Sequence, residues 1–265
     1  MSIIDDATLD HALAGAMEAA DAAAAIICHY WREGVAVELK DDATPVTVAD
    51  REAEQAIRQV LARTLPEASI HGEEFGRGDD RVLTWLVDPL DGTKSFVRRT
   101  PFFSTQIALM AGPELVLGVS KAPLYCETMW ARRGGGAWLD GERVHVAGTS
   151  SLAQASISTG NVRSLTSSSG WDALGALVRD TNRIRGYGDF CHYHLLARGG
   201  LDLVIESDVN ILDIAALAVI VREAGGIFTD LDGGELDIHT RSVLAGVPAI
   251  HSLAAPRLRG ATIPR

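Results

Sequence analysis

The hydrophobic period of the chain changes at Pro66. Before it, apolar residues recur at three- and four-residue steps in an Ala-rich run from Thr8 to Arg32 and again over 48–64, which is typical of amphipathic helices. Gly34 and Pro66 are expected to end these helices. After Pro66, short apolar or alternating segments bounded by Gly, Pro and Asp favour strands. The sequence therefore predicts two long helices packed on a sheet that follows them directly.

The close spacing of the strand-like segments predicts an antiparallel meander, because parallel crossovers need longer connections. A hairpin with Asp140-Gly141 at its turn is expected to follow the meander. The expected strands of the meander are ASIHGEE, VLTWLVD, FSTQIALM, ELVLGVSKAP and ETMWARR.

A Ser-rich stretch with weak patterning, from Thr149 to Gly170, separates this region from a second one. There strand-like and helix-like segments alternate in the order ASISTG, GWDALGALVRD, RIRGY, FCHYHLLARG, DLVIES, IAALAVIVREAG and GIFTD. In a chain of 265 residues we expect two lobes, an α+β lobe over residues 1–150 and an α/β lobe over residues 151–265.

The chain is acidic, with a formal net charge of −11. Such a surface repels nucleic acid and anionic membranes, so an anionic ligand needs local help from a cation, a helix N-terminus or a few placed basic groups. The three cysteines form no CxxC pair, and the N-terminus is acidic where a signal peptide is basic. The most apolar stretch, 22–28, covers about one third of a membrane span. These features predict a cytoplasmic protein with reduced thiols and without membrane or nucleic-acid partners.

The segment Trp85-Leu86-Val87-Asp88-Pro89-Leu90-Asp91-Gly92-Thr93 carries the strongest chemical signal. A buried strand leads into two carboxylates three residues apart, with Pro89 stiffening the turn between them. Gly92 and Thr93 then read as the start of a helix whose free N–H groups can accept a phosphate. Carboxylates together with substrate phosphate are the usual ligands of Mg²⁺. The simpler alternative for Asp88 and Asp91 is a turn followed by a helix N-cap.

Three further segments accompany this motif: Gly72-Glu73-Glu74 before it, Asp213-Ile214-Ala215-Ala216 with Glu223-Ala224-Gly225-Gly226 after it, and Lys40 with Thr44-Pro45-Val46-Thr47 and Asp50 ahead of the second helix. In this order and spacing, from about Lys40 to Gly233, the chain resembles the inositol monophosphatase-like Mg²⁺-dependent phosphatases. The resemblance implies an α-β-α-β-α sandwich of the inositol monophosphatase and fructose-1,6-bisphosphatase type. It also implies a small phosphorylated metabolite as substrate and a homodimer.

The resemblance implies two or three Mg²⁺ ions per active site. Glu73, Asp88 and the carbonyl of Leu90 would hold the first ion, and Asp88, Asp91 and Asp213 the second. Glu73 would share in a weaker third and so take part in catalysis. Asp91 and Asp213 would also contact the substrate. Bound cations would neutralise the phosphate charge and lower the pKa of the attacking water. The simpler alternative for Asp213 is a helix N-cap.

The same resemblance assigns roles around the scissile phosphate. The N–H groups of Gly92 and Thr93 would receive the phosphate, and Thr93, hydrogen-bonded toward Asp50, would orient the attacking water. Asp50 and Thr47 are alternatively only the cap of the second helix. Lys40 is either a charge near the metals or a surface lysine.

Two positions depart from the family pattern. Leu212 stands where an aromatic residue usually precedes the late aspartate, which removes packing but no ligand. Lys94-Ser95 replaces the commoner pair after Thr93.

The second lobe is expected to select the substrate. The stretch from Arg185 to Glu206 is similar to the branch of the family that hydrolyses L-histidinol phosphate. There Asp189 would offer a carboxylate to the cationic end of histidinol, and Glu206 a second contact. The alternative for Asp189 is the N-cap of the helix beginning at Phe190.

The favoured function is therefore histidinol-phosphate phosphatase. The runner-up is an inositol-1-monophosphatase that tolerates other sugar and polyol phosphates. A 3′-phosphoadenosine phosphatase and a non-catalytic, metal-dependent binding protein are the remaining alternatives. His192 and His194 fall on opposite faces of their helix, so we expect them at the surface or in the core rather than in catalysis.

Overall fold

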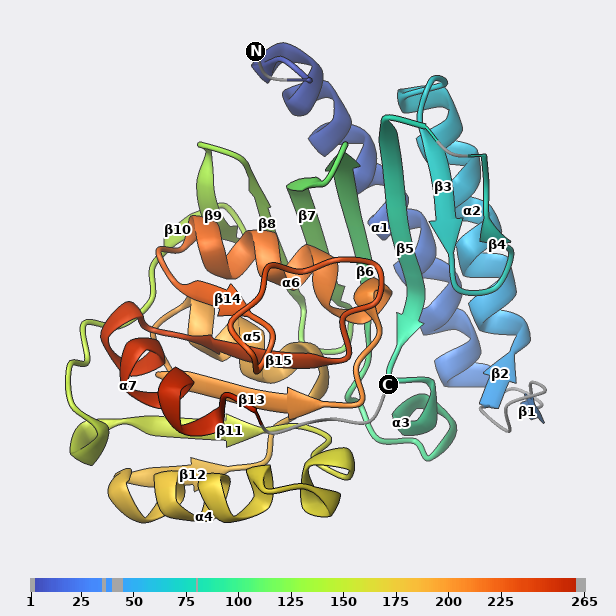
Figure 1. Cartoon of the computed structure of the whole chain (residues 1–265). Helices are drawn as coiled ribbons and strands as arrows, with labels where there is room; N and C mark the ends of the chain where they lie inside the picture. Colours follow the sequence, from blue (N-terminus) through green and yellow to red (C-terminus); the bar gives the residue numbers. More distant parts are fainter. Residues whose placement is uncertain (1–2, 35–36, 40–44, 80, 261–265) are drawn as a thin grey trace.

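The computed structural model describes residues 3–34, 37–39, 45–79 and 81–260. They form five layers in the order helix, sheet, helix, sheet, helix, which confirms the predicted sandwich (Figure 1). Lys40 and Thr44, singled out in the sequence, lie outside the described residues.

The first layer consists of α1 (Asp6–Glu33) and α2 (Val48–Thr64), the two helices expected before Pro66. Asp5 caps α1, and Gly34 ends it with a φ of 84°. The buried residues of α1 are mainly alanines, which allow close packing on α2 and on the sheet. By length and composition α1 is apolar enough to span a membrane, although the sequence analysis found no such segment. Its apolar residues are buried against α2 and the sheet instead, as in a core helix.

The second layer is an eight-stranded sheet with the strand order β10-β9-β8-β7-β6-β5-β3-β4. Its hairpin turn lies at Asp140-Gly141, as predicted, with both residues at positive φ. The strands are β3 (Ser69–Gly72), β4 (Gly76–Arg77), β5 (Leu83–Asp91), β6 (Ser104–Ala111), β7 (Glu114–Ala122), β8 (Glu127–Arg132), β9 (Gly136–Leu139) and β10 (Glu142–Val144).

The prediction of an antiparallel meander is wrong for the first of these strands, because β3 runs parallel to β5. The short edge strand β4 turns back after β3, and the chain then returns to begin β5 in the direction of β3. Parallel strands end at the same edge of a sheet, so Glu73, which follows β3, lies at the edge where β5 reaches Asp88. From β5 to β10 the pairing is antiparallel, as expected.

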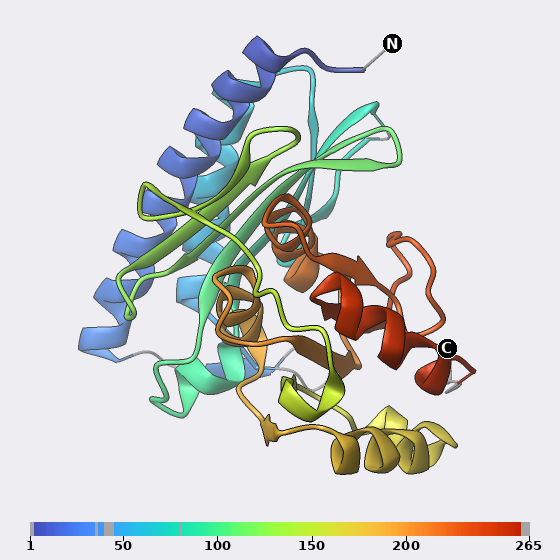
Figure 2. The ribbon, with the colours of Figure 1, turned by 90° about the vertical axis from the view of Figure 1, so that its left-hand side faces the viewer.

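The third layer contains α5 (Asp189–Ala197) and α6 (Ile211–Glu223). Ala216 of α6 packs directly against Gly118 of β7. A Cβ added to Gly118 would come within 2.3 Å of the carbonyl oxygen of Ala216. This contact requires glycine and brings α6 directly onto the eight-stranded sheet. The helix therefore belongs to the second half of the chain but covers the sheet of the first (Figure 2).

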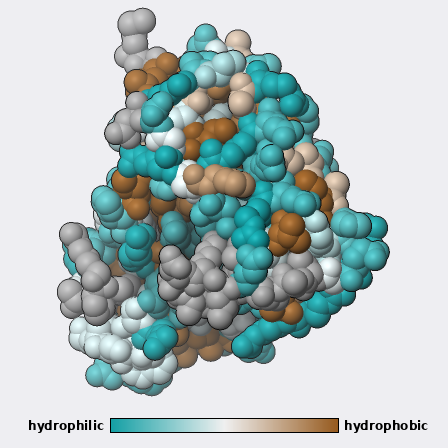
Figure 3. All heavy atoms as spheres, turned by 90° about the vertical axis from the view of Figure 1, so that its right-hand side faces the viewer, coloured by the Kyte–Doolittle hydropathy of each residue, from teal (hydrophilic) through white to brown (hydrophobic). Residues whose placement is uncertain are grey.

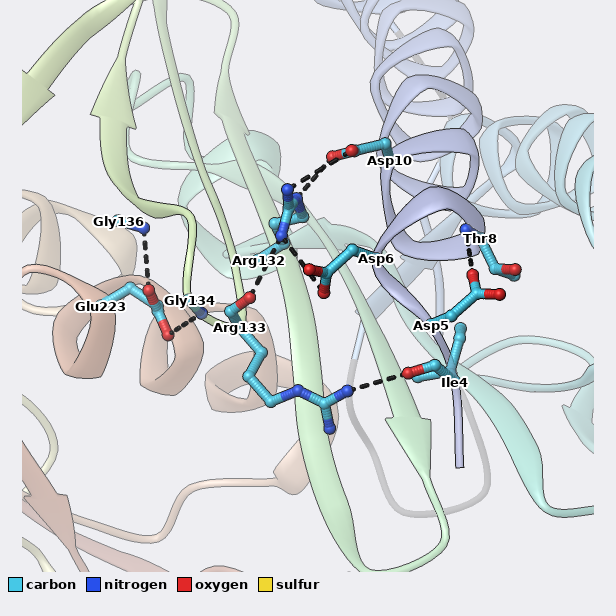
Figure 4. A network of polar contacts seen from close by, with 10 residues as sticks. All are labelled: Ile4, Asp5, Asp6, Thr8, Asp10, Arg132, Arg133, Gly134, Gly136 and Glu223. Carbon is cyan, nitrogen blue, oxygen red and sulfur yellow. Dashed lines mark hydrogen bonds and ion pairs between the residues drawn. The ribbon is translucent and has the colours of Figure 1, made fainter. Parts of the chain in front are cut away.

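The end of α6 is fixed to the turn between β8 and β9. Glu223 accepts hydrogen bonds from the N–H groups of Gly134 (2.9 Å) and Gly136 (2.8 Å). On the other side of this turn, Arg132 pairs with Asp10 of α1 at 2.5 Å (Figure 4). The turn thus connects the first and third layers.

The fourth layer is a five-stranded sheet with the order β12-β11-β13-β15-β14. The alternating sequence pattern predicted β11, β12, β13 and β14 but not β15, which is antiparallel to both of its neighbours. The strands are β11 (Ser156–Thr159), β12 (Arg183–Arg185), β13 (Leu203–Ser207), β14 (Ile227–Thr229) and β15 (Ser242–Gly246).

The fifth layer consists of α4 (Gly170–Asp180) and α7 (Pro248–Leu258), which pack on each other. The sequence analysis did not predict α7. Smaller elements are β1 (Val37–Leu39), β2 (Pro45–Thr47), α3 (Thr93–Val97) and the 3₁₀ turns η1 (Leu152–Gln154) and η2 (Ser164–Ser167). The face that carries α2 and β4 is mainly hydrophilic, with hydrophobic residues in separate groups (Figure 3).

Candidate active site

A cavity of about 310 Å³ opens between the two sheets. The end of β5 and the start of α3 line one side of it, and the starts of α5 and α6 and the end of β13 line the other. Residues from both halves of the chain therefore meet in one cavity. The site residues that line it are Glu73, Asp88, Leu90, Asp91, Gly92, Thr93, Asp189, Glu206 and Asp213.

Three carboxylates form the acidic centre of this cavity. One oxygen each from Asp88, Asp91 and Asp213 lies within 4.8 Å of the others. Burial, and then the neighbouring carboxylates, raise the pKa of Asp88 and Asp91 well above their usual range, and burial raises the pKa of Asp213 to about 7. Glu73 is a further neighbour and hydrogen-bonds to Asp88. Converging buried carboxylates suit a hard divalent cation, because a bound cation offsets their mutual repulsion.

The backbone between Asp88 and Asp91 is irregular. A turn was expected there, but β5 continues through Asp91 with a bulge between the two aspartates. Pro89 fits this position because a bulge needs no ladder donor, and its carbonyl accepts a hydrogen bond from Thr105 Oγ1 at 2.9 Å. The N–H of Leu90 donates to Asp88 Oδ1 at 3.0 Å. The bulge therefore turns both aspartates to the cavity.

Gly92 starts α3 in a conformation that other residues adopt with strain. Its φ is 90°, and an added Cβ would come within 2.6 Å of the Phe102 carbonyl oxygen. Thr93, the first residue of α3, places Oγ1 3.0 Å from Asp50 Oδ1 and 3.0 Å from the carbonyl oxygen of Leu90. Its one hydroxyl proton can be donated to either acceptor, which leaves the oxygen able to accept a hydrogen bond from water.

Asp50 makes the contacts expected of a helix cap and also contacts Thr93. It stands at the third position of α2 and forms a capping box with Thr47, whose N–H and Oγ1 donate to Asp50 Oδ2 at 2.8 and 2.6 Å. Its other oxygen faces Thr93. The pKa of Asp50 is raised above its usual value by burial, and the hydrogen bonds from Thr47 and Thr93 offset only part of this effect. The helix cap thus orients the carboxylate toward Thr93.

Asp213 is likewise part of a capping box, but the N-cap of α6 is Asn210. The N–H of Asn210 donates to Asp213 Oδ2 at 3.0 Å. Leu212, where the family pattern has an aromatic residue, is buried in the core between the sheets. The start of α6 is therefore ordered by its own cap.

Glu54, which was not predicted from the sequence, holds the loop that carries Glu73. Glu54 lies on α2, is fully buried, and accepts hydrogen bonds from the N–H groups of Glu74 (2.6 Å) and Phe75 (3.3 Å). Arg58 Nε donates to the same carboxylate at 2.7 Å. A Cβ on Gly72 would come within 1.9 Å of Glu54 Oε1, so the glycine makes room for it. In the sequence, Glu54 is one of two nearby glutamates on a predicted helix, and no motif distinguishes it from Glu52, so this contact could not be predicted.

At the second-lobe side, Asp189 lies at the start of α5 with a φ of 46°. The N-cap position belongs to Gly188, so the alternative that Asp189 caps this helix is wrong. Burial and then the charge of Glu206 raise the pKa of Asp189 to about 6, against the opposing effects of His192 and Lys94. This partly buried carboxylate faces the cavity without a capping role.

Both carboxylate oxygens of Glu206 contact other residues of the protein. Its Oε1 accepts the N–H of Asn161 at 3.1 Å, and its Oε2 accepts the hydroxyl of Tyr193 at 2.8 Å and lies 3.2 Å from His192 Nε2. These partners outweigh burial and lower the pKa of Glu206. His192 and His194 are both buried, so they lie in the core, which was one of the two environments expected for them. Of the two, His192 contacts the site residue Glu206.

The Inositol monophosphatase family matches residues 8–262. The chain belongs to this family. It is 40% identical to a histidinol-phosphatase of Streptomyces coelicolor over 245 residues, covering 87% of this chain and 88% of that protein. It is 43% identical to a histidinol-phosphatase of Mycobacterium tuberculosis over 206 residues, covering 74% and 78%. The structure of an inositol monophosphatase from Anabaena superposes with a TM-score of 0.83 at 28% identity and covers 96% of this chain and 98% of that one.

Membership of the inositol monophosphatase family makes the chain a phosphoric monoester hydrolase that acts on a small phosphorylated substrate. The alternative of a non-catalytic binding protein is therefore not supported. The family is metal-dependent, and the acidic centre lies where the sequence resemblance put its metal ligands.

Proposed function

We propose that this phosphatase hydrolyses L-histidinol phosphate with Mg²⁺ held by Glu73, Asp88, Asp91, Asp213 and the carbonyl of Leu90. The donor set supports this ion, because it consists of carboxylate and carbonyl oxygens gathered in a buried centre. When bound, Mg²⁺ supplies charge neutralisation for the phosphate and acidifies a water molecule.

The remaining groups position the reactants. The N–H groups of Gly92 and Thr93, at the start of α3, are available to the phosphate oxygens. Thr93 donates to Asp50, so its hydroxyl oxygen is free to accept a hydrogen bond from the attacking water and orient it. Asp50 is fixed for this purpose by Thr47. In this arrangement water is the nucleophile, so no phosphoenzyme is needed.

The position of the Asp189 carboxylate in the cavity is the observation that favours histidinol phosphate as the substrate. Its carboxylate shares the cavity with the acidic centre, and with a pKa of about 6 it is mainly ionised at neutral pH. A cationic amine or imidazolium can pair with it, whereas a neutral polyol gains no ion pair. Glu206 reinforces the negative potential, although its oxygens are already engaged by Tyr193, Asn161 and His192. The names of the Streptomyces and Mycobacterium relatives agree with this substrate.

An inositol-1-monophosphatase is the second candidate, because the Anabaena structure of that name covers almost the whole chain. Phosphate release from L-histidinol phosphate, inositol 1-phosphate and 3′-phosphoadenosine 5′-phosphate, each with Mg²⁺ or with EDTA, tests the proposal. We expect activity only with Mg²⁺ and the highest kcat/KM with histidinol phosphate. Equal kcat/KM for histidinol phosphate and inositol 1-phosphate would contradict the substrate assignment, and full activity in EDTA would contradict the metal. Cytoplasmic location, homodimer formation and the absence of membrane and nucleic-acid partners stay predictions from the sequence.

A further inference from the structure

Gln106 is a buried amide on β6, one strand away from the acidic centre. The strand register pairs it with Asp88 of β5 on one side and with Ser120 of β7 on the other. Two residues earlier, Ser104 pairs with Asp91. Residues two apart share one face of a strand, so Ser104 and Gln106 lie together on the face that α6 covers.

The amide nitrogen of Gln106 faces two serine hydroxyls. Its Nε2 donates to Ser104 Oγ at 2.8 Å and to Ser120 Oγ at 3.0 Å. Both serine oxygens are therefore acceptors toward the amide, and each hydroxyl proton is left for another partner. The partner of Ser104 is Asp91, with 3.3 Å between Oγ and Oδ2.

The other serine continues the network into the second lobe. Ser120 Oγ lies 2.8 Å from His194 Nε2, and His194 Nδ1 lies 3.2 Å from Glu127 Oε2. With the Ser120 proton donated to Nε2, the remaining imidazole proton is on Nδ1 and faces Glu127. Arg198 completes the chain by donating to Glu127 Oε1 at 2.9 Å. His194 and Arg198 stand on and just after α5, the helix that begins with Asp189.

The amide oxygen of Gln106 is buried without a hydrogen-bond partner among the described residues, which lowers the stability of the fold. The whole Gln106 side chain is buried. An unpaired buried carbonyl destabilises a fold, and an apolar side chain of similar size would avoid that penalty. A purely structural role therefore does not explain an amide at this position.

We infer that Gln106 is a positioning residue for the metal site: its amide directs the Ser104 hydroxyl to Asp91 and so holds that carboxylate in the orientation that binds Mg²⁺. The inference rests on the proposed use of Mg²⁺. Without the amide, the Ser104 hydroxyl is free to rotate to other acceptors, and Asp91 loses its one side-chain donor from β6. The same amide fixes Ser120 toward α5, so the acidic centre and the helix carrying Asp189 are held by one side chain.

The test compares Gln106→Leu, Ser104→Ala and the double variant with the wild type. Mg²⁺ binding is measured by isothermal titration calorimetry without substrate, and thermal unfolding is measured without metal. We expect Gln106→Leu to weaken Mg²⁺ binding about 3- to 30-fold, the range for loss of a hydrogen bond to a charged group. Its metal-free melting temperature should change little, because the unpaired carbonyl and the two hydrogen bonds to the serines are lost together. Ser104→Ala should weaken binding to a similar degree, and the double variant no further, because Gln106 acts through Ser104.

Thr229→Val is the matched control, since Thr229 lies on β14, outside the residues that line the cavity, and the change removes a buried hydroxyl bonded to His251. It should leave Mg²⁺ affinity unchanged. Unchanged affinity in Gln106→Leu would overturn the inference, as would additive losses in the double variant. Gln106→Met serves for the same comparison if the leucine variant does not fold. A wild type that binds no Mg²⁺ would instead contradict the proposed function itself, so the two failures are distinguishable.

Discussion

A carboxylate oxygen of Asp88 and one of Asp213 lie within 4.8 Å of each other, although Asp88 belongs to β5 of the first sheet and Asp213 to the first turn of α6. This distance is within reach of a common cation. Asp88 is also the neighbour of Glu73 and Asp91, so it is central to the acidic cluster.

Asp88→Asn should therefore nearly abolish turnover. The change removes a charge from the residue proposed to contact both principal ions, while the metal-free stability should hold or rise because carboxylate repulsion falls. Steady-state kinetics at saturating Mg²⁺ and thermal unfolding in EDTA measure the two effects. More than about a tenth of wild-type activity, a loss of only ~1.4 kcal/mol of barrier stabilisation, would contradict the bridging role.

Asp189→Asn separates the two candidate substrates. It keeps size and hydrogen bonding but removes the charge, so kcat/KM for histidinol phosphate should fall about 30- to 1000-fold, as for loss of a desolvated pair worth roughly 2–4 kcal/mol. Inositol 1-phosphate should be hydrolysed as before. Asp208→Asn is the control, because Asp208 lines the same cavity but is bonded to Ser164. Equal losses on both substrates would show that Asp189 serves the general site.

Glu54→Gln should raise the Mg²⁺ concentration for half-maximal activity about 3- to 30-fold. The loop after β3 would lose a charged acceptor of two N–H groups, and Arg58 its partner, with a stability loss of roughly 2–3 kcal/mol. Mg²⁺ titrations of activity and urea unfolding measure both quantities. Glu18→Gln, which breaks an exposed pair with Arg63, should change neither. An unaltered Mg²⁺ requirement in Glu54→Gln would argue against its part in placing Glu73.

Gly92→Ala should lower stability by about 2 kcal/mol or more and reduce kcat. The added Cβ meets the Phe102 carbonyl, and the strain moves the start of α3. Gly141→Ala is a close control, because Gly141 has a φ of 88° but nothing within 4 Å of an added Cβ. The control should lose stability only, by roughly 1 kcal/mol. If both variants keep full activity, the placement of Gly92 at the phosphate is wrong.

The metal-free protein should lose stability as the pH rises from about 4 to about 7. The folded-state pKa of Asp213, about 7, is above its unfolded value of about 4. Its stabilising contribution is therefore fully present below the unfolded pKa and is lost as the pH rises through the folded pKa, and the raised pKa values of Asp88 and Asp91 act in the same direction. Mg²⁺ competes with these protons, so the increase in melting temperature on adding Mg²⁺ should be larger at pH 8 than at pH 5. An Mg²⁺ effect independent of pH would contradict this linkage.

Most of the fold could be predicted where one hydrophobic period extends over a long segment. The helices α1 and α2 and the strands β5 to β9 are of this kind, and Gly34 and Asp140-Gly141 mark their ends and turns as expected. The parallel pairing of β3 with β5 could not be predicted, because it depends on β4, a strand of two residues in a polar segment. The strand β15 was missed for a similar reason: its place between β13 and β14 is a tertiary choice that no local pattern specifies.

The acidic residues of the site could be found because they stand in motifs, and the structure brings Glu73, Asp88, Asp91 and Asp213 into one cavity. Their supporting residues could not. Glu54 and Gln106 are single polar residues in otherwise ordinary helix and strand patterns, and each contacts a residue of another element that the local pattern does not specify. The bulge at Pro89 was anticipated only as a stiff turn, since the sequence does not show that Asp91 still pairs with β6.

The position of α6 has a consequence for the order in which the protein matures. Glu73, Asp88 and Asp91 are synthesised early, but the helix that brings Asp213 and covers the first sheet at Gly118 comes late in the chain. On the ribosome, the first sheet therefore stays uncovered on one face, and its acidic cluster incomplete, until α6 has emerged and docked. A nascent chain shorter than this has no complete site, so catalytic competence reports that the chain has been made and folded at least through α6.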